Sequence, residues 1–557
     1  MLPVEQPVKT YTGLDGKPLD GGYIYFGLPN QNPITAPVTV YWDSAGTQPA
    51  AQPLRTVNGY IVRNGTPANV FFSGSYSELV QDSAGRQVFF ARTSDDFSIA
   101  SFINNFIINL ASSVGSSLIG FIQSAIGSVT RTVQDKLRDE VSVFDFMTSA
   151  QIADVQARTY ALDLTAPIQA ARDHIALNRK KLIFPPGGYK YSVSPNWAIH
   201  HAEIVFEGDV TLRYTGTGDA VIFDASASDA VVFITGFCYG VKFGWGKRPN
   251  IEAPATAGNG IYVRSMHHCK IGGRVRGCGS ASSGLRVEFA VCTEFDVVVS
   301  GNEDGWYLNA KPANGYYLTR RNSGETTSYC TFLNPVAEGP TIGIYRHATL
   351  GNNFFGGTAE ACSLYGTFGD LSAEQDKFVG TDFEANATAD VFEQGTGLIL
   401  ENCDTFSNLT LGAACKNATV YGGRHSKILS DTGSLRSTIR DVVFNRFNDG
   451  TNLTDAGTGT LLDNCRNGGT NTTYLSGTLA FAGATIANNA LAIFSITVTG
   501  AKLGDFAQIA YDAGGLGNMI IWGQVTAANL VTAFAFNNTG AGVTVPAGNW
   551  RAVVSRR

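Results

Sequence analysis

One short pattern recurs between residues 330 and 386, and this repeat constrains the fold more than any other feature of the sequence. The stretch GNNFFGGTAEA, which begins at Gly351, aligns with DKFVGTDFEAN, which ends at Asn386, at an offset of 24 residues. CTFLNPVAEG, which begins at Cys330, aligns with the first stretch at an offset of 22 residues. A period in the low twenties that carries short apolar strands is typical of a β-solenoid, because one coil cannot bury its own apolar face and the coils must stack.

The same alignment places acidic residues above one another. Glu338, Glu360 and Glu384 occupy one position of the repeat, and Asp382 lies two residues before Glu384. Because stacked parallel strands lie ~4.8 Å apart, we expect a column of carboxylates on one face of the solenoid. Retaining glycosidases use two carboxyl groups ~5–5.5 Å apart, and inverting ones use a pair ~6.5–9.5 Å apart. Repulsion between stacked carboxylates also raises the pKa of one of them, as a general acid requires.

Glu338, Glu360, Asp382 and Glu384 are therefore the candidate catalytic residues. Glu360 is central among them, because acidic residues are expected on both neighbouring coils. The alternative is a structural ladder of solvated carboxylates, or of carboxylates bound to neighbouring backbone amides. The sequence leaves both interpretations open.

An insertion interrupts the repeat between Glu303 and Tyr329, and insertions in solenoids often lie on the binding face. Its aromatic rings suit stacking on the apolar faces of sugars, and its arginines provide fixed hydrogen-bond donors. The candidate substrate-binding residues of this segment are Asp304, Trp306, Tyr316, Tyr317, Arg320, Arg321 and Glu325. The alternative is a surface network of arginine and acidic side chains, with the aromatic rings packed on the solenoid wall.

A second candidate set lies one coil further along, at Tyr345, Arg346 and His347. A tyrosine, a histidine and an arginine together suit β-elimination from a uronic acid, in which the arginine neutralises the substrate carboxylate. His347 is therefore a further candidate substrate-binding residue, although a single histidine is more often structural. The chain has no GxSxG motif, which argues against a serine-dependent deacetylase.

Length and composition limit the remaining possibilities. A chain of 557 residues is expected to form three or more domains, and 63 glycines with only 15% charged residues favour a turn-rich β protein. The net charge of −6 argues against nucleic acid as a partner. The nine cysteines are scattered and lack CxxC spacing, so we expect neither a zinc site nor a disulfide framework, and no cofactor.

Three further segments flank the solenoid. Residues 1–97 contain short strands separated by turn signals, including a repeated DSAG, and predict a small β domain. Residues 98–140 have apolar residues mostly three or four apart, which predicts a helix. Because this helix is apolar on most sides, we expect a three-stranded bundle with copies of itself rather than a membrane span. Residues 468–557 alternate strongly between apolar and polar residues and predict a β-sandwich module.

Several stretches resemble parts of bacteriophage tailspike and tail fibre proteins. GGYIYFGLPNQNP, which begins at Gly21, is similar to the head-binding domain of tailspikes. VSVFDF (Val141–Phe146), IQAA (Ile168–Ala171) and LIFPPGGY (Leu182–Tyr189) follow the order seen at the start of the pectate-lyase-like β-helix in tailspikes and polysaccharide depolymerases. The acidic loop common in that family is replaced here by MTSAQIADVQARTYALDLT, so no function is inferred for it. The segment SITVTGAKLGDFAQIA, which begins at Ser495, looks like the terminal β modules of phage tail proteins.

This resemblance implies a mostly β, homotrimeric protein with a right-handed parallel β-helix over residues 141–467. Residues 1–97 would attach it to tail or portal-adaptor proteins of the virion, and residues 468–557 would form a trimerisation or tip domain. The β-helix would bind bacterial capsule or lipopolysaccharide and cleave it as an endoglycosidase-type depolymerase. The alternatives are a receptor-binding fibre without catalysis and a polysaccharide lyase.

Overall fold

The computed structural model describes residues 8–94, 99–178, 180–225, 236–301, 305–444, 453–467, 470–471 and 474–555. The chain divides into two compact units, Met1–Arg138 and Asp139–Arg557.

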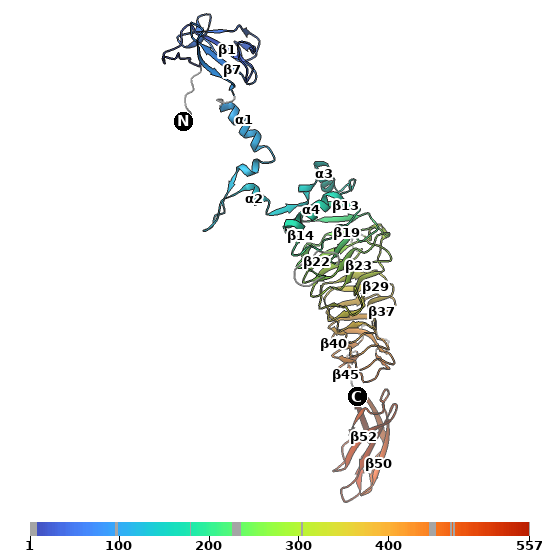
Figure 1. Ribbon diagram of the computed structural model, residues 1–557. Helices are drawn as coiled ribbons and strands as arrows, with labels where there is room; N and C mark the ends of the chain where they lie inside the picture. Colours follow the sequence, from blue (N-terminus) through green and yellow to red (C-terminus); the bar gives the residue numbers. More distant parts are fainter. Residues whose placement is uncertain are drawn as a thin grey trace. The chain divides into compact units, whose positions relative to one another are not determined.

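A single sheet of 32 strands dominates the second unit. It begins at β11 (Glu140–Ser142) and ends at β47 (Thr470–Asn471), and its strand pairs are parallel except for the last, β46 with β47. The strands lie in successive coils, which stack from β14 to β45 in Figure 1. This arrangement confirms the predicted right-handed parallel β-helix.

Each coil contributes strands to three walls, which we call A, B and C. Wall A contains β12 (Lys181–Phe184), β14 (Glu203–Phe206), β18 (Lys242–Phe243), β27 (Thr331–Leu333), β31 (Asn353–Phe355), β35 (Lys377–Val379), β38 (Ile399–Glu401), β40 (Thr419–Tyr421), β42 (Thr438–Arg440) and β45 (Leu461–Asp463). Wall B contains β13 (Gly187–Tyr191), β15 (Val210–Tyr214), β19 (Asn250–Glu252), β28 (Val336–Glu338), β32 (Thr358–Glu360), β36 (Asp382–Glu384), β43 (Val443–Phe444) and β46 (Arg466–Asn467). Wall C contains β16 (Val221–Asp224), β20 (Ile261–Arg264), β23 (Ser283–Glu288), β25 (Asn314–Thr319), β29 (Ile342–Arg346), β33 (Tyr365–Gly369), β37 (Ala389–Glu393) and β44 (Leu453–Asp455). Four longer strands turn the corners: β22 (Lys270–Val275) and β24 (Glu294–Val299) join A to B, and β39 (Asp404–Leu411) and β41 (Arg424–Ser430) join B to C.

A column of phenylalanines inside wall A sets the register of the central coils. Phe332 pairs with Phe354, and Phe354 pairs with Phe378, as the repeat predicts. Phe295 extends the column, and successive ring centroids lie 4.9, 4.5 and 4.3 Å apart. All four rings are fully buried in the core of the solenoid. The offsets of 22 and 24 residues are therefore the lengths of real coils.

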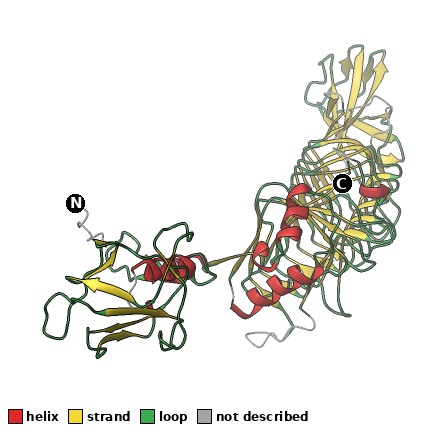
Figure 2. Cartoon of the chain, turned by 90° about the horizontal axis from the view of Figure 1, so that it is seen from above, coloured by secondary structure: helices red, strands yellow, loops and turns green. Residues whose placement is uncertain are grey.

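Helices cover the N-terminal end of the solenoid, where the first coil would otherwise expose its apolar interior. A 3-10 helix, η3 (Val143–Phe146), leads to α3 (Ser149–Ala157) and α4 (Thr165–Asn178), both next to the first strands (Figure 1, Figure 2). The Thr148 side chain begins α3 with a capping box that involves Gln151. Ile168 and Ile175 of α4 belong to the same buried core as Leu182.

The first unit contains a small antiparallel β domain. Its strand order is β6–β5–β4–β1–β7–β8, and its core is formed by Ile24, Phe26, Leu54 and the side chains packed around them. The strands are β1 (Tyr23–Gly27), β4 (Leu54–Val57), β5 (Tyr60–Arg63), β6 (Thr66–Pro67), β7 (Ser77–Gln81) and β8 (Gln87–Ala91), with β2 (Val40–Tyr41) and β3 (Pro49–Ala50) paired beside them.

The single helix predicted over residues 98–140 is confirmed only for α1 (Ile99–Leu110). Beyond it the chain forms η2 (Gly115–Leu118), a hairpin of β9 (Gly120–Phe121) with β10 (Arg131–Thr132), and α2 (Val133–Leu137), so the prediction is wrong there. Helical period alone missed the end of α1 at Leu110, after which the chain turns back so closely that a Cβ atom at Gly115 would lie 1.9 Å from the Leu110 carbonyl oxygen. Close approach of the chain to the end of α1 therefore requires a residue without a side chain.

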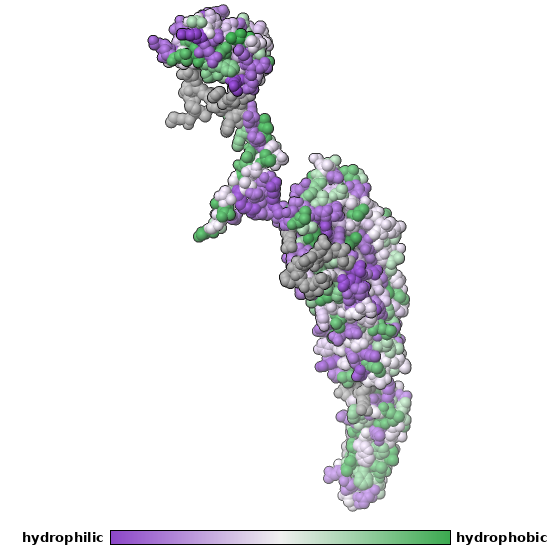
Figure 3. Space-filling view, viewed as in Figure 1, coloured by the Kyte–Doolittle hydropathy of each residue, from purple (hydrophilic) through white to green (hydrophobic). Residues whose placement is uncertain are grey.

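The segment from α1 to β10 exposes many apolar side chains, some of them coloured green in Figure 3. They are Ile103, Phe106, Ile107, Ile108, Leu110, Val114, Leu118, Ile119, Ile122, Ile126 and Val129. No helix among the described residues is long and apolar enough to cross a membrane.

The C-terminal part of the chain forms two antiparallel three-stranded sheets that share one core around Trp550 and Val531. One sheet contains β48 (Tyr474–Phe481), β55 (Gly548–Ser555) and β51 (Phe506–Tyr511), and the other contains β50 (Leu491–Thr497), β53 (Leu530–Phe536) and β52 (Ile520–Ala527). A short pair, β49 (Ala484–Ile486) with β54 (Val543–Val545), accompanies them. This is the predicted β-sandwich.

The phenylalanine column predicts that alanine substitutions at the adjacent residues Phe354 and Phe355 differ greatly in their effect on stability. Phe354→Ala should lower the free energy of unfolding by about 3–5 kcal/mol, because it leaves a cavity between stacked rings. Phe355→Ala removes the same side chain from the outer face, where Phe355 is 41% exposed, and should cost less than about 1 kcal/mol. Equilibrium unfolding of the two variants in guanidinium chloride would measure the two free-energy losses. Equal losses would contradict the role assigned to the column.

Candidate functional site

Three glutamates form a row on the outer face of wall B. Glu338 pairs with Glu360 across β28 and β32, and Glu360 pairs with Glu384 across β32 and β36. The residues before them, Ala337, Ala359 and Phe383, are buried, so the carboxylates point outward. The predicted column of carboxylates is therefore present in the structure.

The row continues toward the N-terminus with residues of a different kind. Ile251 pairs with Val275 and Val275 with Val299, so the next residues, Glu252, Arg276 and Ser300, extend the row beyond Glu338. Arg213 and Arg276 hold the buried Glu252 carboxylate at 2.9 and 3.2 Å. The Ser300 hydroxyl donates a hydrogen bond to the Glu338 carboxylate. The two arginines thus compensate the negative charge of Glu252. Glu338, Glu360 and Glu384, in contrast, are consecutive members of the row with no arginine between them.

Crowding of like charges changes the titration of the central member. Partial burial, the charges of Glu338 and Glu384 and hydrogen bonds to both of these carboxyl groups raise the pKa of Glu360 to about 7. A carboxyl group with this pKa is partly protonated at neutral pH and can donate a proton, as a general acid does.

Asp382 lies on the same outer face, two residues before Glu384. Its strand neighbours are Thr358 on one side and Asp404 on the other. Asp404 forms an ion pair with Arg424 at 2.5 Å. Asp382 therefore belongs to a second outward row, where an arginine compensates part of the negative charge.

The first part of the insertion lies at the N-terminal end of the glutamate row. Trp306 packs against the solenoid core, and its ring would contact a Cβ atom placed at Gly301. A Cβ atom at Gly339, which follows Glu338, would lie 2.9 Å from the Lys311 Nζ and 3.8 Å from the Trp306 Nε1. This loop thus brings an indole ring and an ammonium group beside the row.

Sequence reasoning identified Trp306 but missed Lys311, Arg276 and Ser300. The alignment of Phe332 with Phe295 would have placed Gly301 at the position of Glu338, because the register shifts by one residue between these strands, so Ser300 could not be found from the repeat. Lys311 had no sequence signal, since its place depends on how the loop folds back.

The predicted role of Tyr316 is wrong. Its side chain is fully buried, and its hydroxyl donates a hydrogen bond to the Val297 carbonyl oxygen at 2.5 Å, so it cannot stack on a sugar. Tyr317, the next residue, is half-buried on the outer face of wall C and stacks on Tyr345 at 4.8 Å. Alternation along β25 places one tyrosine inside and the other outside.

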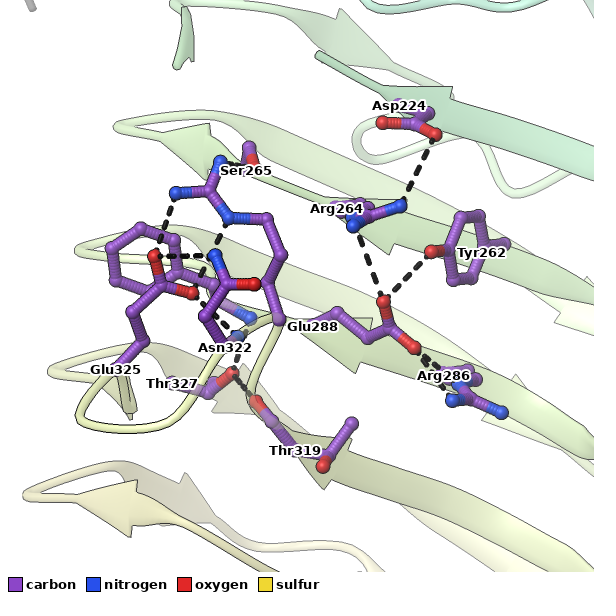
Figure 4. Close-up of polar contacts among 12 residues, drawn as sticks. Asp224, Tyr262, Arg264, Ser265, Arg286, Glu288, Thr319, Asn322, Glu325 and Thr327 are labelled. Atoms are coloured by element: carbon purple, nitrogen blue, oxygen red, sulfur yellow. Dashed lines mark hydrogen bonds and ion pairs between the residues drawn. The ribbon is translucent and has the colours of Figure 1, made fainter. Parts of the chain in front are cut away.

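The second part of the insertion forms an ionic network at wall C, shown in Figure 4. Arg321 forms an ion pair with Glu325 at 2.6 Å and donates a hydrogen bond to the Ser265 hydroxyl at 2.9 Å. Although partial burial raises it, the pKa of Glu325 is lowered overall by hydrogen bonds from Arg321 and Asn322. The loop therefore uses these side chains to hold its own shape. Arg320 is exposed beside them, and Asp304 lies outside the described residues.

A neighbouring network in Figure 4 shares the outer face of wall C. Glu288 accepts hydrogen bonds from Tyr262 at 2.8 Å and from Arg286 at 2.6 Å, and Arg264 lies between Glu288 and Asp224. The two ends of the insertion thus lie at different walls, and the candidate residues do not form one sugar site.

The residues proposed for β-elimination, Tyr345, Arg346 and His347, do not all lie on the same face of the wall. The His347 Nδ1 contacts the Asp370 carboxylate at 2.5 Å on the surface. Arg346 instead points inward, is 1% exposed, and forms ion pairs with Asp376 at 3.4 Å and Glu393 at 2.5 Å. The expectation that Arg346 neutralises a substrate carboxylate is therefore wrong, because its guanidinium group is committed inside the solenoid.

The fold and this site define a right-handed parallel β-helix protein with an acidic row on wall B. No protein-family model matches the chain, and no curated protein matches its sequence.

Among solved structures, the chain is similar to mutants of the tailspike protein of Escherichia coli bacteriophage HK620. One matches with a TM-score of 0.36 and 12% identity, and a second, in complex with a pentasaccharide, with 0.35 and 13%. A third, in complex with a hexasaccharide, matches with 0.33 and 12%. Each match covers 82% of this chain and 100% of the other chain.

The raised pKa of Glu360 predicts how stability depends on pH. The folded state holds this proton more tightly than the unfolded state, so Glu360 should lower stability as the pH rises from about 4.5 to about 7. Glu360→Gln removes the charge and should stabilise the protein by about 1–2 kcal/mol at pH ~8, after allowance for solvent screening, but have little effect at pH ~4.

Melting temperatures of the variant and the parent at the two pH values would measure this difference. Glu374→Gln, at an exposed glutamate of another strand, serves as the control and should shift neither value. A loss of stability in Glu360→Gln at pH ~8 would contradict crowding of charge in the row.

Proposed function

We propose that this chain is a tailspike-type receptor-binding protein that binds a bacterial surface polysaccharide along wall B and hydrolyses its glycosidic bonds there. The observation that carries the proposal is the row of Glu338, Glu360 and Glu384, with the pKa of its central member at about 7. The resemblance of residues 141–189 to phage depolymerases supports the substrate class.

In the proposed reaction, Glu360 gives its proton to the glycosidic oxygen while the bond between this oxygen and the anomeric carbon breaks. An ionised neighbour, Glu338 or Glu384, attacks the anomeric carbon and forms a covalent glycosyl intermediate. Glu360, now ionised, then takes a proton from water as the water displaces the carboxylate, which restores both groups. Direct pairing of Glu360 with Glu338 and Glu384 supports this route, because neighbouring strands lie ~4.8 Å apart and this spacing suits the short carboxyl separation of retaining enzymes.

The loop that contains Trp306 and Lys311 would hold the sugar next to the row. An indole ring offers a flat apolar surface for a pyranose ring, and an ammonium group donates to hydroxyl oxygens. Ser300 would position Glu338 through its hydrogen bond.

A receptor-binding fibre without catalysis is the second candidate, in which the row only binds hydroxyl groups of the receptor. A lyase is less well supported, since Arg346 is buried in ion pairs. Asp382 remains a candidate partner of Glu360 because the two lie on adjacent coils of wall B.

The proposal extends to assembly. The apolar side chains exposed between residues 103 and 129 favour a homotrimer in which copies of this segment cover one another. Residues 1–97 would attach the trimer to the virion tail, and residues 468–557 would act as a trimerisation or tip domain.

If the row is catalytic, replacing the carboxyl group of Glu360 by an amide should strongly lower turnover. Glu360→Gln keeps the shape but removes the titrating group, and should lower turnover of the host polysaccharide at least ~100-fold. Release of reducing ends would measure turnover, and binding of the same polysaccharide should persist in the variant.

Glu338→Gln, Glu384→Gln and Asp382→Asn should identify the partner of Glu360, and Glu374→Gln, away from the row, serves as the control. Products that first appear with the parent anomeric configuration would support the retaining route. If the three glutamate variants and Asp382→Asn all keep activity within a few-fold of the parent, these carboxylates are not catalytic and only form a solvated structural ladder.

The assembly proposal predicts a trimer at micromolar concentration, with about three times the chain mass of 59.2 kDa by light scattering. Ile107→Asp introduces a charge on the exposed apolar surface of α1 and should weaken the trimer. Asn109→Asp adds the same charge at a polar position of the helix and should have a smaller effect. A monomeric parent protein would contradict the proposal.

A further inference from the structure

A loop of one coil forms a pocket over wall A, at a distance from the glutamate row. The chain leaves β18 at Gly244 and reaches β19 through residues 244–249, with positive φ angles of 58° at Gly244 and 73° at Gly246. A Cβ atom at Gly244 would lie 2.8 Å from the Gly272 carbonyl oxygen, so the loop closely contacts the next coil. Between this loop and β14 lies a pocket of about 310 Å³, at the lower end of the range for ligand sites.

The charges of this pocket differ from those of the chain as a whole. Lys242, Lys247 and Lys270 line it together with one acidic residue, Glu203, which leaves a local charge of +2 in a chain of net charge −6. Lys270 forms an ion pair with Glu294 at 2.9 Å. Among the described residues, neither Lys242 nor Lys247 forms an ion pair. Two ammonium groups are therefore available to a ligand.

An aromatic ring completes the lining. Trp245 comes from the loop itself and is half-buried, and the Lys270 Nζ lies 4.9 Å from its ring centroid. The cation and the ion pair hold the ring in place on the wall. A pocket with an indole face and ammonium groups suits a ligand that carries a flat apolar ring face and an anionic group.

We propose that this pocket binds an acidic sugar residue, a pyranose ring that carries a carboxylate. The ring lies against Trp245, and the carboxylate accepts hydrogen bonds from Lys242 and Lys247. The choice of a sugar over other anions rests on the proposed function, whereas the choice of an anion rests on the pocket.

The pocket lies close enough to the row to share a polymer with it. β22, which carries Lys270, is separated from β28, which carries Glu338, by β24 alone. Two coil spacings correspond to ~10 Å along the axis of the solenoid. Walls A and B meet at the corner that β22 and β24 turn, so a polysaccharide bound at the row could also reach the pocket.

The test uses the full-length Glu360→Gln protein and a matched pair of probes, methyl β-D-glucuronide and methyl β-D-glucoside, which differ only in the carboxylate. Saturation-transfer NMR titrations should show binding of the glucuronide and at least about tenfold weaker binding of the glucoside. Trp245→Ala should abolish binding, and Lys247→Gln, which keeps the loop, should weaken it about tenfold. Lys416→Gln, at an exposed lysine of a distant coil, should leave it unchanged.

Equal binding of the two probes, or glucuronide binding unaffected by Lys247→Gln, would overturn the inference. Displacement of the glucuronide by equimolar inorganic phosphate would also overturn it, since the pocket would then select charge and not the sugar. Cleavage of polysaccharide by the parent protein is measured separately. Loss of the pocket proposal therefore leaves the proposed hydrolysis untouched, and absence of hydrolysis leaves glucuronide binding by the pocket to be judged by itself.

Discussion

Parallel backbone pairing in a fixed register is the interaction on which the rest of this structure depends. Each coil lies on the next, so a residue in one coil has its counterpart directly above it. Inside the solenoid this brings together apolar rings, such as Phe354 and Phe378, which stabilise the stack. The same register on the outer face brings together Glu338, Glu360 and Glu384, where like charges repel. The stability of the inner column thus maintains the crowding of the outer row.

Charged residues inside the solenoid and on its outer face have different neighbours. Arg346 is buried between Asp376 and Glu393, where burial raises the pKa of both carboxyl groups while the arginine opposes it. A buried charge requires such partners, since its desolvation is costly. Glu360, on the outer face, has carboxyl groups as neighbours, and its pKa rises to about 7. A carboxyl group held in this way is suited to proton transfer, which structural ion pairs do not require.

The sequence predicted the strand pairing that follows from the repeat. It did not predict the positions of side chains in loops, or the direction in which single side chains point. The alignment on Phe354 predicted the strand partners of Glu360, because the repeat spacing and coil length coincide. It gave no basis for placing Tyr316 inside the core, since two adjacent tyrosines leave the phase of the strand ambiguous. The position of Lys311 beside Gly339 depends on loop folding, which leaves no periodic signal. Helical period likewise continued past Leu110, although α1 ends there and the chain turns back to bring Gly115 against the Leu110 carbonyl oxygen.

Stacking of the coils forces one glutamate of the row, Glu360, to keep its proton near neutral pH. Infrared difference spectra between the parent protein and Glu360→Gln, recorded as a function of pH, would test it most directly, because a protonated carboxyl group has a carbonyl band that a carboxylate lacks. We expect a carboxylic acid band that is absent from the variant and that titrates in the parent protein with a midpoint of about 7. A spectrum in which the Glu360 carboxyl group is fully ionised by pH ~5 would contradict it.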